Sequence, residues 1–85
     1  MENFEKKYYF DMYIREGEFH IDRGKSSAIQ CNYYTAKNEF LIANKYFSMA
    51  VNIAKELDNF SLISHANSLI YMCEAEILRL KEHQR

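Results

Sequence analysis

The sequence has no proline and no tryptophan, and only two of its 85 residues are glycine. β-Sandwiches and small barrels need turn residues every few positions, and this chain cannot supply them. No apolar run approaches the roughly 18 residues that a membrane-spanning helix needs, and no signal peptide is visible. These absences favour a cytoplasmic protein that is built from long helices with few turns and does not bind a membrane.

Cysteine is scarce as well. Cys31 and Cys73 are too few for the disulfide framework of a small secreted domain, and no Cys-x-x-Cys motif is present. Free cysteine is among the residues most often buried. We therefore expect two reduced thiols that line the core.

Neither sign of charge dominates the chain. The formal net charge is −1 at pH 7, with 27% charged and 48% hydrophobic residues. Proteins that bind nucleic acids or membrane surfaces usually carry a basic excess, which is missing here. The composition is that of an ordinary globular domain, and residues 1–85 are enough for a single one.

The middle of the chain carries the strongest periodic pattern. Apolar residues recur there at alternating spacings of four and three, which keeps them on one helical face. A second apolar stripe lies about 100° away on the same helix. A helix with two apolar stripes needs two neighbours, so we expect a long central helix over about 27–57. The first stripe is Ile29, Tyr33, Ala36, Phe40, Ala43, Phe47, Ala50, Ala54 and Leu57, and the second is Ile42, Tyr46, Met49 and Ile53.

Shorter apolar stripes precede and follow this segment. Gly24 is a natural helix end because glycine tolerates a positive φ, and Asp58 and Asn59 break the pattern again further on. The short connections make sequential helices antiparallel. We predict an all-α fold, an antiparallel three-helix bundle with helices over about 2–23, 27–57 and 61–81.

The chain contains no convincing catalytic or metal-binding set. Cys73 lies between Ile70 and Ile77 on an apolar stripe, where a thiol is desolvated and unreactive. Glu16 and His20 stand four residues apart, but no Glu-x-x-His pair on a second helix completes a di-metal site. We therefore expect no enzyme activity, no metal and no cofactor.

Protein recognition has positive support in the aromatic N-terminal segment. Residues 4–14 carry more apolar side chains than one helical face can bury, and tyrosine and methionine are common in interface cores. We predict that the protein-binding residues are Tyr8, Tyr9, Met12 and Tyr13.

Residues 34–54, YTAKNEFLIANKYFSMAVNIA, resemble the centre of a tetratricopeptide repeat. The residues at the characteristic positions of that repeat are Tyr34, Phe40, Ala43, Phe47 and Ala50. The same stretch is similar to the microtubule-interacting-and-transport domain, a three-helix bundle that binds short helical peptides between its helices. Both resemblances imply protein or peptide binding without chemistry.

We therefore expect a non-enzymatic protein–protein interaction module, acting as a small adaptor or inhibitor. Its size and its Asn-, Lys- and Ile-rich composition suggest a phage or mobile element as its source, and its partner is another protein or a second copy of the chain, as in a homodimer. The alternative is a nucleic-acid-associated regulatory protein that uses two Lys/Tyr clusters. Acidic neighbours of the first cluster disfavour nucleic acid. The clusters are Lys6, Lys7, Tyr8 and Tyr9, and Tyr33, Tyr34 and Lys37.

Overall fold

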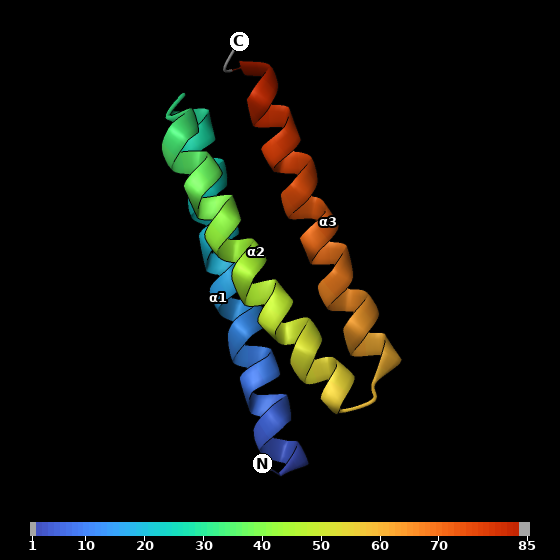
Figure 1. Ribbon diagram of the computed structural model, residues 1–85. Helices are drawn as coiled ribbons and strands as arrows, with labels where there is room; N and C mark the ends of the chain where they lie inside the picture. The colour runs from blue at the N-terminus through green and yellow to red at the C-terminus, as the bar shows by residue number, and fades with distance from the viewer. Residues whose placement is uncertain (1, 84–85) are drawn as a thin grey trace.

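The computed structural model describes residues 2–83, which form an all-α fold (Figure 1). The helices are α1 (Asn3–Ile29), α2 (Tyr33–Glu56) and α3 (Phe60–His83), and the described residues contain no strand. Each helix runs antiparallel to the one before it, so the chain begins at one end of the rod and α3 finishes at the other (Figure 1). The predicted all-α three-helix architecture is confirmed.

The first turn lies later in the chain than the pattern predicts. α1 continues through Gly24 to Ile29, and the chain reverses at Cys31, which has a φ of 62°. The Asn32 side chain then accepts a hydrogen bond from the Thr35 backbone N–H at 3.5 Å and caps α2. The predicted helix end at Gly24 and the predicted start of the central helix at residue 27 are therefore wrong. As a result α1, with 27 residues, is longer than α2, with 24.

The second turn lies where the sequence pattern breaks. Asp58 has a φ of 57°, and the Asn59 backbone N–H donates to the Ala54 carbonyl at 3.1 Å, which closes the end of α2. The Asn59 side chain accepts from the Leu62 N–H at 3.1 Å and satisfies one of the free donors at the start of α3. Asp58 thus reverses the chain and Asn59 caps the next helix, so α2 and α3 form a tight antiparallel hairpin.

The two glycines are packing residues rather than turn residues. A Cβ added at Gly24 would lie 2.7 Å from the nearest Phe40 ring atom, and one added at Gly17 would overlap the Phe47 ring. Both rings are completely buried. The two glycines of α1 are seven residues apart, and so are the two phenylalanines of α2. A single antiparallel register of the two helices therefore places one ring on each glycine. This explains why α1 does not end at Gly24: the residue is needed inside the helix, where the Phe40 ring of α2 packs directly against it.

α2 is the central helix, because it packs against both of its neighbours whereas α1 and α3 touch only over a short stretch (Figure 1). α1 contributes five buried residues and α2 contributes eight, but α3 contributes only Ala66, Cys73 and Leu80. α1 and α2 are therefore a closely packed pair, and α3 packs mainly on α2, with most of its core contacts made by partly buried side chains.

The two cysteines have opposite environments. Cys73 is fully buried, and burial, followed by the charges of Glu74 and Glu76, raises the pKa of its thiol to about 11. Cys31 is exposed in the first turn. The expectation of two core thiols is therefore wrong for Cys31, because the turn falls where the sequence pattern predicted helix.

Candidate protein-binding surface

A line of aromatic contacts crosses from α1 to α2. Ring centroids lie 5.5 Å apart for Tyr8 and Tyr9, 6.4 Å for Tyr9 and Tyr13, and 6.3 Å for Tyr13 and Tyr46. The Tyr46 ring then stacks on the His20 imidazole at 5.7 Å with an interplanar angle of 12°. We call these five residues the aromatic ladder.

The ladder contains three of the four predicted binding residues. Tyr8 is 59% exposed, whereas Tyr9 and Tyr13 are half-buried, and Tyr13 packs against the core. Met12, the fourth, is also half-buried, and helical spacing places it one turn from Tyr8 and Tyr9. The structure therefore brings the four predicted residues to one region of α1.

α2 extends this surface with residues of its second apolar stripe, which the sequence pattern predicts to be covered by a neighbouring helix. Tyr46 contacts α1 through Tyr13 and His20, but Ile42 and Met49, one turn to either side of Tyr46, are each 38% exposed. The second apolar stripe is therefore only partly buried. Its open part adds aliphatic and thioether surface beside the ladder.

A part-buried polar contact between α1 and α2 fixes His20, the last residue of the ladder. The His20 Nδ1 lies 2.6 Å from the Glu39 Oε2, and the Arg23 Nε lies 3.6 Å from the Glu39 Oε1. Glu39 is only 8% exposed, so its carboxylate depends on these partners for compensation of lost hydration. The contact holds the imidazole on which Tyr46 stacks.

Sequence reasoning missed this contact because it considered His20 together with Glu16, on the same helix. A usable signal was nevertheless present: Glu39, Ala43, Tyr46 and Ala50 are spaced by four, three and four, which places a carboxylate on a buried face. A carboxylate in that position needs a partner from another helix.

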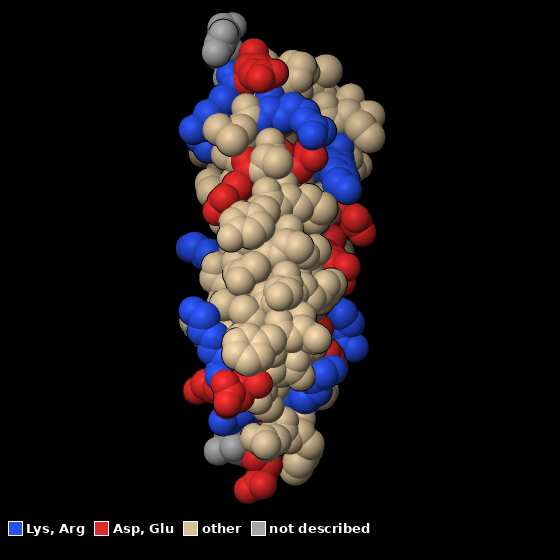
Figure 2. Space-filling model, turned by 90° about the vertical axis from the view of Figure 1, so that its right-hand side faces the viewer, with Lys and Arg blue, Asp and Glu red and all other residues tan. Residues whose placement is uncertain are grey.

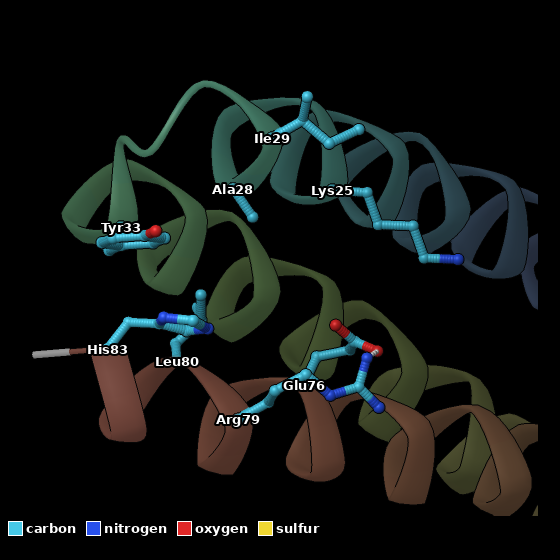
Figure 3. Close-up of a pocket in the computed structure, with 8 residues that line it drawn as sticks. All are labelled: Lys25, Ala28, Ile29, Tyr33, Glu76, Arg79, Leu80 and His83. Carbon is cyan, nitrogen blue, oxygen red and sulfur yellow. Dashed lines mark ion pairs between the residues drawn. The ribbon is translucent and has the colours of Figure 1, made fainter.

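A hollow, which we call the end slot, opens at the other end of the rod between all three helices (Figure 3). Its volume is about 550 Å³. Tyr33 and His83 stack on each other at one side, with centroids 5.0 Å apart, and Arg79 pairs with Glu76 at 3.2 Å. The residues around it are Lys25, Ala28, Ile29, Tyr33, Glu76, Arg79, Leu80 and His83.

The outer face of α3 forms a third feature. Residues 60–73 contain no Lys, Arg, Asp or Glu, and Figure 2 shows an uncharged strip with charged side chains along both margins. Phe60 and Tyr71 on this helix are 79% and 67% exposed. The strip is a second apolar surface, separate from the ladder.

The two Lys/Tyr clusters do not combine into a basic surface. The Lys7 ammonium pairs with Asp11 at 3.0 Å, and the Tyr33 ring is already stacked on His83. One ammonium group of the first cluster and one ring face of the second are thus engaged within the protein, which does not favour that alternative.

Comparison with family models, with curated proteins and with solved structures finds no match for this chain. Within residues 2–83, no three His, Cys, Asp or Glu side chains are grouped so that they could hold a metal ion. No helix in that part of the chain combines the length and the apolar character that crossing a membrane requires.

Proposed function

We propose that this chain is a non-enzymatic protein-interaction module that binds its partner through the aromatic ladder together with Met12, Ile42 and Met49. The observation that carries the proposal is the continuous line of ring contacts from Tyr8 to Tyr46, which crosses two helices and is partly exposed. Contiguous exposed apolar surface of this kind marks interaction sites on small proteins.

The side chains of the ladder are already restricted before a partner binds, which lowers the entropy cost of binding. Tyrosine offers a large contact area with only two side-chain torsions, and its hydroxyl tolerates water in the free state. Neighbouring rings and the His20–Glu39 contact already restrict these side chains. Less conformational entropy is therefore lost when a partner covers them, and more of the contact energy remains as affinity.

A small module with one such surface suits an adaptor or an inhibitor, which acts by occupying a surface of another protein. The partner class that we favour is a second, different protein in the cytoplasm. Self-association into a homodimer through the same surface is the competing outcome, and sedimentation of the purified chain over a range of concentrations separates the two.

The test is the double substitution Tyr9→Ser with Met12→Ser. Capture from host lysate identifies the partner, and calorimetry with the purified partner then measures the affinity. We expect the unfolding midpoint to stay close to that of the parent, because neither residue belongs to the buried core. Affinity should fall tenfold or more, about 1.4 kcal/mol.

The matched control is Phe60→Ser with Tyr71→Ser, which removes two exposed rings from the outer face of α3. This control should bind as the parent does. Equal weakening by both double variants, or unchanged binding by the ladder variant, contradicts the proposal. Binding that requires nucleic acid and weakens steeply with salt would support the nucleic-acid alternative instead.

A further inference from the structure

The end slot has no residue in common with the aromatic ladder. The ladder residue of α1 that is nearest in sequence, His20, stands five positions before Lys25, about 7.5 Å along a helix, and Tyr9 stands sixteen positions before it, about 24 Å. The slot forms where α1 ends, α2 begins and α3 ends, because α1 and α3 contact each other so little that side chains leave space between them. Its volume of about 550 Å³ is in the range of ligand pockets, about 300–1,000 Å³.

The slot has an apolar part and a polar part, and α1 and α3 contribute to both. Ala28 of α1 points into it, and Leu80 of α3 lies opposite, whereas Ile29 turns outward (Figure 3). Leu80 is only 4% exposed and belongs to the core, so it forms the fixed floor of the apolar part, and half-buried Ala28 is the more accessible of the two. An aliphatic side chain of a ligand would find methyl groups there.

Charge on the polar part favours an anion. Lys25 and Arg79 are cationic and Glu76 is the single carboxylate among the residues around the slot. Arg79 already pairs with Glu76, and Lys25 has no ion pair among the described residues. One positive charge is therefore left over at Lys25.

The stacked pair of Tyr33 and His83 closes one side of the slot. The neighbouring Cys31 raises the pKa of the Tyr33 hydroxyl, through a side-chain hydrogen bond first and through the charge of its thiolate second. The hydroxyl is thus engaged with Cys31, and the stacked pair serves as a wall of the slot.

We propose that the end slot binds an acidic peptide segment of a partner protein, with an aliphatic side chain on Ala28 and Leu80 and an adjacent carboxylate against Lys25 and Arg79. A nucleic acid fits less well, because the Tyr33 ring face that could stack on a base is covered by His83. This site is additional to the ladder and does not depend on it.

The experiment titrates the ¹⁵N-labelled full chain with the capped tripeptide acetyl-Leu-Asp-Leu-amide and follows the backbone amides by NMR. Amides around the slot, including those of Ala28, Tyr33 and Leu80, should shift and saturate. The neutral analogue acetyl-Leu-Asn-Leu-amide should bind about threefold more weakly, a change in affinity within the range that one exposed ion pair contributes. Ladder amides should not move.

Variants connect the shifts to the charges. Lys25→Gln and Arg79→Gln should each weaken binding of the acidic tripeptide by about threefold. Lys45→Gln, an exposed lysine of α2 outside the slot, is the matched control and should have no effect. Amide spectra of all three variants should retain the dispersion of the parent, which shows that the fold is intact.

Three results would overturn the inference. These are equal affinity for the acidic and neutral tripeptides, shifts that do not saturate or that lie outside the slot, and stronger binding of a short oligothymidylate at the same amides. Because the ladder residues are unchanged throughout, failure here leaves the proposed function standing, and failure of the ladder variant leaves this site standing.

Discussion

Replacement of Gly17 by alanine is the sharpest test of how α1 and α2 pack. In an ordinary helix interior this change stabilises the protein by about 1 kcal/mol, because alanine is the better helix former. Here the new methyl group would overlap the Phe47 ring, which is completely buried and has no free space to move into. We therefore expect the opposite sign.

The magnitude follows from two opposing contributions. Overpacking a filled core costs about 1–3 kcal/mol, and overlap with a ring rather than with a flexible chain end favours the upper value. Subtracting the gain of about 1 kcal/mol in helix propensity leaves a net destabilisation of about 2 kcal/mol. For a chain of this length that corresponds to a fall in melting temperature of about 10 °C.

Urea unfolding followed by circular dichroism measures the effect. Ser26→Ala, at an exposed position on the same helix, is the control and should be neutral or slightly stabilising. In a Phe47→Leu background the ring is gone, so Gly17→Ala should lose most of its cost. A stabilising effect of Gly17→Ala in the parent, or an equal cost in both backgrounds, would refute the packing of Phe47 on Gly17.

Three further predictions concern polar and thiol groups. His20→Ala leaves the buried Glu39 carboxylate without its 2.6 Å partner and should cost about 1–3 kcal/mol in urea unfolding, whereas leucine at both positions should restore stability. Cys31 should react with a maleimide in the folded protein and Cys73 only after unfolding, as mass spectrometry would show. The pKa of Cys73 is raised in the fold from 9.0 to about 11, so the stability that its protonated thiol contributes is complete below pH 9 and is lost as the pH rises towards 11. Unfolding midpoints of Cys73→Ala should fall less over that pH interval than those of the parent.

Helix number and type are readable from the sequence because the spacing of apolar residues is a local property. The alternation of three and four predicts three helices, and Asp58 and Asn59 mark the second turn correctly. Gly24 was misleading, because the residues around a glycine at the end of an apolar stripe are the same in two cases. The glycine can end the helix, or it can lie inside the helix and pack against an aromatic ring of another helix. Only the antiparallel register, which places Phe40 opposite, distinguishes the two roles.

The candidate surface was predictable to a similar degree. An excess of apolar residues in 4–14 indicates that some of them stay exposed, and this is a property of one helix. The contact between Tyr13 and Tyr46 joins residues 33 positions apart, and that between His20 and Glu39 joins residues 19 apart. No local pattern reports such pairs, so the α2 part of the ladder became visible only with the fold.

Unequal burial of the helices has a consequence for how the native state opens. α1 and α2 interlock through rings that pack on glycines, whereas α3 contributes three fully buried residues, and its other core contacts come from side chains that are only partly buried. Regions with little buried apolar contact open at lower free energy than the whole protein. Backbone amides of α3 should therefore exchange with solvent deuterium through a partial opening in which the α1–α2 hairpin remains folded, so that the hairpin is the last cooperative unit to unfold.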